Sequence, residues 1–121
     1  MKHKNTFIHA AGGIGHAFRN EATFRLHVLA MALVIVLGVA LHINATEWLF
    51  VTGCSMLVLS MELINTAIEN VCNLISTEHH PLIKIIKDVA AAAVMVSAIG
   101  SVITGSIIFV PKIIHYIKIG L

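Results

Sequence analysis

The chain has 121 residues, of which 58% are hydrophobic and only 12% are charged. A water-soluble domain of this size could not bury so much apolar surface, so the composition excludes an ordinary soluble protein and indicates an integral membrane protein. The formal charge of +2 is small and scattered, which excludes nucleic acid as a partner, and the length fits one domain over residues 1–121.

The first predicted element is an amphipathic helix over about residues 6–25. Apolar residues recur every three or four positions and form one stripe, at Phe7, Ala11, Ile14, Phe18 and Ala22. Lys, Arg and His occupy the other faces, which predicts a helix that lies on the membrane surface. The segment GGIG at 12–15 is not followed by the Lys-Ser/Thr pair of a phosphate-binding loop, so we interpret it as a bend or a site of close packing.

Three apolar segments follow, and the sequence predicts membrane spans at about 26–46, 48–70 and 89–111. Each is long enough to cross a hydrocarbon layer of about 30 Å. The second begins at Trp48, a residue type that is typical of the membrane interface. Small residues in the third span predict close helix packing and self-association. They are Ser97, Gly100, Ser101, Thr104 and Gly105.

The distribution of Lys and Arg predicts the orientation of the chain. Six basic residues lie before the first span or between the second and third spans: Lys2, Lys4, Arg19, Arg25, Lys84 and Lys87. Only Lys112 and Lys118 follow the third span. Because basic residues favour the cytoplasmic side, we expect the N-terminus and the second link to be cytoplasmic.

A polar stripe marks the cytoplasmic end of the second span. Glu62, Asn65 and Glu69 lie within about 60° of one another around a helix, and Thr66 and Asn73 join them. Glu62 lies about 21 Å below Trp48, near the edge of the hydrocarbon, and Glu69 about 10 Å further toward water. An acid at this depth is a functional hypothesis, because its burial is costly. The alternative is a helix that becomes polar as it leaves the membrane.

The link between the second and third spans collects groups that could hold a metal-bound polyphosphate. They are Glu78, His79, His80, Lys84, Lys87 and Asp88. Carboxylates favour magnesium, which typically binds one or two acids together with substrate phosphates. Zinc is not expected, because the spacing of a zinc site is missing. Glu21 could supply a second magnesium ligand beside Glu69, or it could form an ordinary helical pair with Arg25.

Three segments together resemble one family, the small prokaryotic diacylglycerol kinases and undecaprenol kinases. They are NEATFR at 20–25, ELINTAIE at 62–69 and EHHPLIKIIKD at 78–88, and the similarity extends over about residues 7–112. The resemblance implies phosphoryl transfer from MgATP to the primary hydroxyl of a membrane lipid. It also implies a homotrimer in the bacterial inner membrane, with active sites shared between neighbouring subunits.

The resemblance also implies roles for individual residues. Glu62 looks like the general base, and Glu21 and Glu69 look like the magnesium ligands. Asn65 would support this cluster, and Phe24 and Arg25 lie where the family's surface helix meets the lipid. The residues expected at the nucleotide are Glu21, Glu69, Glu78, His79, His80, Lys87 and Asp88.

Several details favour undecaprenol as the lipid over diacylglycerol, which remains the alternative. His27 stands where diacylglycerol kinases tend to carry an acid, and TEWLF, HHPL and IIFVPK look more like undecaprenol kinases. Asn73 departs from the family, which usually has an acid there. The sequence leaves two other classes of protein as alternatives: a small proton-coupled transporter, which would use a membrane acid, and a non-enzymatic scaffold subunit, which would need no acid stripe.

Overall fold

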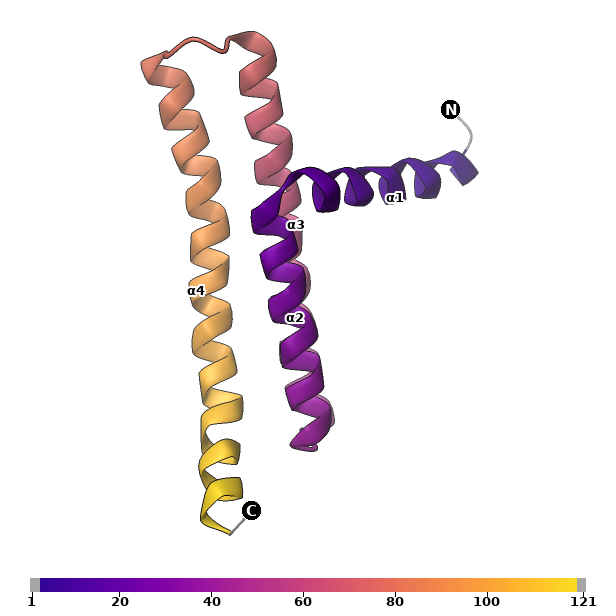
Figure 1. The fold of residues 1–121 in the computed structure, drawn as a ribbon, viewed down its shortest axis with the longest axis vertical. Helices are drawn as coiled ribbons and strands as arrows, with labels where there is room; N and C mark the ends of the chain where they lie inside the picture. Colours follow the sequence, from indigo (N-terminus) through magenta and orange to yellow (C-terminus); the bar gives the residue numbers. More distant parts are fainter. Residues whose placement is uncertain (1–2, 120–121) are drawn as a thin grey trace.

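The computed structural model describes residues 3–119 and contains four helices (Figure 1). They are α1 (His3–Asn20), α2 (Ala22–Ala40), α3 (Ala45–Ile75) and α4 (Pro81–Lys118). α3 and α4 form a long hairpin, α2 packs against α3, and α1 projects sideways from the bundle. The last three helices are each long and apolar enough to cross a membrane. The expected all-α, multi-pass architecture is therefore confirmed.

Several helix boundaries differ from the predicted ranges. The predicted spans of 26–46 and 48–70 correspond to α2 (Ala22–Ala40) and α3 (Ala45–Ile75), because a turn separates the two helices at 41–44. α1 ends at Asn20 instead of near 25, because Glu21 is extended (φ −116°, ψ 107°) and α2 begins directly after it. α4 runs from Pro81 to Lys118, well beyond the predicted span of 89–111. His80 caps its start and Pro81 occupies a first-turn position, where a missing N–H costs little. Lys2, which counted toward the predicted orientation, lies outside the described residues.

The elbow between α1 and α2 is held by Phe24 and Arg25. Phe24 is buried there, as is Ala17. The Arg25 guanidinium donates hydrogen bonds from Nη1 to the carbonyl oxygens of Phe18 (2.7 Å) and Arg19 (3.0 Å). Carbonyls in the last turn of a helix lack helical partners, so Arg25 satisfies them and sets the bend. The elbow in turn positions Glu21.

The opposite end of the bundle is fastened by the turn between α2 and α3. Asn44 caps α3 in a reciprocal arrangement with Glu47, and Lys112 on α4 lies 3.2 Å from the Glu47 carboxylate. A small core of Ile43, Val51, Ile108 and Phe109 lies beside these contacts. Three helices therefore converge at this end.

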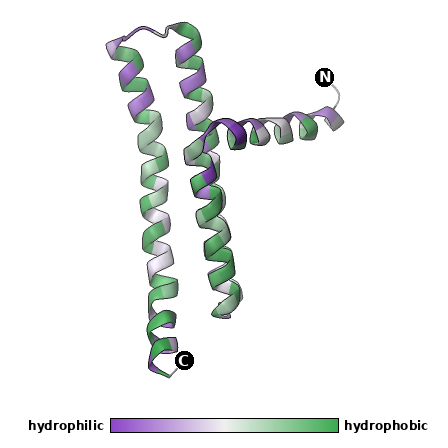
Figure 2. Ribbon diagram, in the orientation of Figure 1, coloured by the Kyte–Doolittle hydropathy of each residue, from purple (hydrophilic) through white to green (hydrophobic). Residues whose placement is uncertain are grey.

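Most large apolar side chains on α2, α3 and α4 face outward. Leu33, Val36 and Ile107 are typical, each more than half exposed. Figure 2 shows this apolar character along the lower part of the bundle, with hydrophilic residues near the hairpin tip and at the elbow. Lipid or other protein must cover such a surface, because water would not.

Candidate active site

The polar stripe of α3 faces the interior of the bundle. Glu62 is 3% exposed, and Asn65 and Thr66 are each 7% exposed. A helix that merely became polar on leaving the membrane would direct these side chains toward water. Their burial instead indicates a site built into the protein.

Glu62 has a buried carboxylate oxygen with no hydrogen bond. Its Oε2 lies 3.4 Å from Nε2 of His27 on α2, yet neither this atom nor Oδ1 of Asn65 has a hydrogen-bond partner among the described residues. Leaving a buried polar atom unsatisfied costs about 1–3 kcal/mol. Such atoms call for an explanation, and a missing ligand is one.

Two further carboxylates lie close to Glu62. Asn65 donates a hydrogen bond from Nδ2 to Oε1 of Glu69 at 2.6 Å, which orients that carboxylate. Glu69 and Glu21 are both half-buried, and both are near enough to Glu62 for their charges to interact. Within residues 3–119 Glu21 makes no ion pair with Arg25, because the guanidinium is engaged with α1. The elbow and α3 thus gather three acids.

This arrangement fits a magnesium ion that is shared with a substrate. Across the described part of the chain, no three His, Cys, Asp or Glu side chains form a set that could hold a metal by themselves. Magnesium does not require such a set, because it typically keeps waters and takes one or two carboxylates plus substrate phosphates. Glu21 and Glu69 offer the correct hard oxygen donors.

The predicted nucleotide segment lies elsewhere, at the tip of the α3–α4 hairpin. Glu78 and His79 are exposed, and His80 caps α4 by accepting the Leu82 N–H at Nδ1 (3.1 Å). Lys87 and Asp88 each form a side-chain hydrogen bond. From Glu62 to the end of α3 the helix rises by about 20 Å. A single chain therefore does not bring the tip to Glu62.

Two of the charged residues in this segment, Lys87 and Asp88, have partners within the hairpin. Lys87 donates from Nζ to Oδ1 of Asn73 at 2.7 Å, which links α4 to α3. Asp88 accepts from Lys84 at 2.6 Å, an exposed pair one helical turn apart. Both contacts are accessible, so an incoming phosphate could exchange for them.

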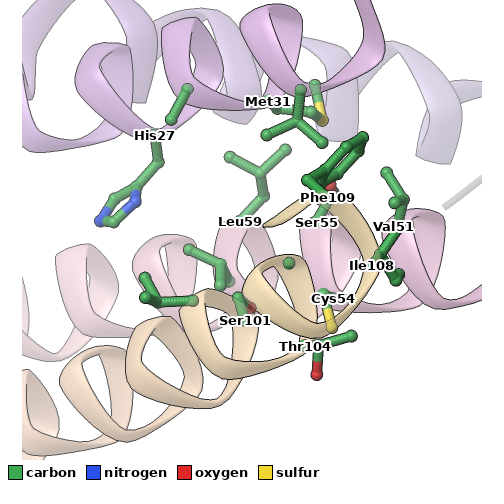
Figure 3. Close-up of a pocket in the computed structure, with 15 residues that line it drawn as sticks. His27, Met31, Val51, Cys54, Ser55, Leu59, Ser101, Thr104, Ile108 and Phe109 are labelled. Carbon is green, nitrogen blue, oxygen red and sulfur yellow. The ribbon is translucent and has the colours of Figure 1, made fainter. Parts of the chain in front are cut away.

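An apolar cavity of about 240 Å³ lies between α2, α3 and α4 (Figure 3). His27 stands at one end, and Ile108 and Phe109 stand at the other. Nearly all of the lining is hydrocarbon, so the cavity suits part of a lipid chain. The sequence did not predict this cavity. The small residues Ser101, Thr104 and Gly105 line the cavity and could have indicated it. In the sequence they predict only a packing surface.

His27 is the functional candidate that sequence reasoning missed. In the sequence it is only a difference from diacylglycerol kinases, and nothing local pairs it with Glu62. The two residues are on different helices, and only the packing of α2 on α3 brings them together.

Comparison with known proteins gives a consistent set of similarities. The sequence model described as prokaryotic diacylglycerol kinase matches residues 8–109. The chain is 41% identical over 108 residues to undecaprenol kinase from Bacillus subtilis (strain 168), covering 89% of this chain and 88% of that protein. It is 37% identical over 105 residues to diacylglycerol kinase from Escherichia coli (strain K12), covering 84% and 86%. A diacylglycerol kinase from Synechocystis is 36% identical over 110 residues, covering 90% of this chain and 63% of that protein.

Proposed function

Because the chain belongs to the prokaryotic diacylglycerol kinase family, it is a lipid kinase, and we propose that it phosphorylates the primary hydroxyl of undecaprenol. The 41% identity to an undecaprenol kinase supports this lipid, as do His27 and the segments TEWLF, HHPL and IIFVPK. Diacylglycerol is the alternative acceptor, since diacylglycerol kinases are 36–37% identical to the chain. The reaction would then make phosphatidic acid.

The observation that carries the mechanism is the buried carboxylate of Glu62, whose Oε2 has no hydrogen bond within residues 3–119 and which contacts His27 at the end of an apolar cavity. A lipid whose chain occupied the cavity would bring its hydroxyl to the His27 end. Glu62 would then accept the hydroxyl proton as general base while the oxygen attacks the γ-phosphorus of ATP. General bases of this kind typically contribute 10²- to 10⁴-fold to the rate.

Glu21 and Glu69 would hold magnesium on the nucleotide phosphates. When bound, the ion would offset the negative charge of the transferring group. Such electrostatic stabilisation, together with positioning, is the main contribution of a protein to phosphoryl transfer. The hydrogen bond from Asn65 would keep the Glu69 carboxylate turned toward the ion, as supporting residues commonly do around metals.

The hairpin tip would bind the rest of the nucleotide through Glu78, His79, His80, Lys87 and Asp88. A phosphate would attract the Lys87 ammonium more strongly than the neutral Asn73 amide does. Since the tip is distant from Glu62 along α3, we expect a homotrimer in which a neighbouring subunit supplies it. We also expect a bacterial inner-membrane location with the N-terminus and the hairpin tip in the cytoplasm, where ATP is found. The opposing counts of basic residues support this orientation.

The first test is phosphate transfer from MgATP in mixed micelles, with undecaprenol and diacylglycerol offered separately. Undecaprenol should be the better acceptor for the wild-type protein. Glu62→Gln should lower kcat by about 10²-fold or more, because the amide cannot take a proton. Glu47→Gln, the same change near the other end of α3, should retain wild-type turnover.

Two other results would contradict parts of this proposal. Phosphorylation of diacylglycerol alone would leave the fold and mechanism intact but replace the lipid. Normal turnover by Glu62→Gln would remove Glu62 from the chemistry.

A further inference from the structure

We propose that His27 is a positioning residue that holds Oε2 of Glu62 and thereby turns Oε1 toward the lipid hydroxyl. This inference rests on the proposed role of Glu62 as the general base. It goes further by assigning the two oxygens of the carboxylate different tasks.

The charges around Glu62 favour this role for His27. The other charged groups that act on Glu62 are the carboxylates of Glu69 and Glu21, which repel it. His27 instead attracts the Glu62 carboxylate, and its Nε2 lies 3.4 Å from Oε2. A proton on Nε2 would point a donor at an oxygen that otherwise has no partner in the described part of the chain. His27 is therefore placed to bond the buried oxygen of the Glu62 carboxylate, for which the described residues provide no hydrogen bond.

The position of His27 also supports this role. His27 also lines the apolar cavity, and it is the only basic side chain on that lining (Figure 3). The imidazole thus touches both the base and the space proposed for the lipid. Its side chain is 20% exposed, against 4% for Glu62, and His27 lines the cavity whereas Glu62 does not.

The contact between His27 and Glu62 is long in this structure. At 3.4 Å the contact is longer than a good hydrogen bond, for which about 2.7–3.2 Å is usual. Catalytic hydrogen bonds are often long without substrate and shorten when it binds. Lipid entry beside His27 would press the imidazole toward Oε2. The base would then be fixed only when a substrate is present.

No proton passes through His27 during the phosphoryl transfer. The hydroxyl proton moves to Oε1 of Glu62 as the lipid oxygen bonds to the γ-phosphorus. The bond between that phosphorus and the bridging oxygen breaks, and ADP leaves with the electron pair. His27 keeps its Nε2 proton throughout.

The test compares His27→Gln with His27→Asn under saturating lipid and MgATP. Both variants carry the same amide, but Gln places its nitrogen near the position of Nε2 and Asn is one methylene shorter. We expect His27→Gln to stay within about threefold of the wild-type kcat. His27→Asn should lose roughly 10- to 100-fold, the scale of a misplaced catalytic group. The KM for MgATP should stay unchanged in both.

A second measurement separates positioning from a general loss of structure. Both substitutions are repeated in the Glu62→Gln background, where the base is already absent. His27→Asn should then have no further effect on the residual rate, because there is no carboxylate left to position. An equal loss in both backgrounds would overturn the proposal, and so would a His27→Gln variant as slow as His27→Asn.

The failure of this inference can be distinguished from the failure of the proposed function. If the wild-type protein phosphorylates a lipid and Glu62→Gln does not, but His27→Asn keeps full kcat, only the role of His27 is wrong. If Glu62→Gln retains normal turnover, the base assignment falls and the role of His27 falls with it.

Discussion

The ammonium group of Lys87 has a neutral hydrogen-bond partner, Asn73, so that its positive charge can act on a substrate. Its Nζ donates to Oδ1 of Asn73 at 2.7 Å, and Asn73 stands where the family resemblance predicts an acid. An amide accepts the hydrogen bond but does not neutralise the ammonium. Lys87 therefore keeps its full charge for a phosphate while remaining ordered.

We expect Asn73→Asp to weaken nucleotide binding slightly. The new carboxylate would pair with Lys87 and compete with the phosphate. Exposed pairs are worth less than about 1 kcal/mol, so the KM for MgATP should rise only about threefold and kcat should stay within about twofold. Asn44→Asp is the matched control, because Asp also caps a helix and Asn44 lies at the far end of α3. A large gain in kcat for Asn73→Asp would instead mean that an acid is needed here for catalysis.

Close approach of α2 and α3 depends on Gly38. A Cβ at this position would lie 2.8 Å from Cη2 of Trp48 and 3.0 Å from Cδ1 of Ile43. The indole is rigid, so the helices would have to move apart. Trp48, which the sequence assigned to the membrane interface, thus also packs between helices.

We expect Gly38→Ala to destabilise the fold by about 1–3 kcal/mol, the usual cost of overpacking a close contact. The measurement is the midpoint of thermal unfolding in detergent, monitored by circular dichroism. Gly53→Ala is the control, since nothing lies within 4 Å of a Cβ there and Ala is the better helix former. Equal midpoints for the two variants would show that the contact with Trp48 is looser than described.

Across the whole molecule, the proposed chemical centre and the proposed nucleotide segment are far apart. Glu62 lies beside α2, and Lys87 bonds Asn73 near the hairpin tip, about 16 Å further along α3. The exposed apolar faces of α2, α3 and α4 offer surface for neighbouring copies. Both features favour sites that are completed by a second subunit.

Mixing inactive variants tests this arrangement. Glu62→Gln and Lys87→Met should each be nearly inactive alone. If one subunit supplies Glu62 and another supplies Lys87, random assembly of equal amounts should restore about a quarter of the wild-type activity. Glu62→Gln mixed with Glu69→Gln is the control, because both residues lie on α3 of one chain. No recovery in the first mixture would mean that each chain builds its own site.

Much of the fold and part of the site follow from local patterns. The three spans, the amphipathic start and the shared face of Glu62, Asn65 and Glu69 were all predicted from the sequence. The end of α1 at Asn20 and the start of α4 at Pro81 were not, because they depend on Arg25 capping α1 and on α4 packing along α3. Phe24 and Arg25 were expected at the lipid, and their contacts here hold the elbow.

By itself, the sequence determined that this protein crosses a membrane on helices and carries acids on one face of the second span. Those properties depend on hydrophobic length and on the helical repeat, which are local. Only the tertiary structure decided that His27 meets Glu62, that Lys87 meets Asn73 and that a cavity opens beside the base. Each of these joins residues on different helices, and the packing that joins them depends on the shape of whole surfaces.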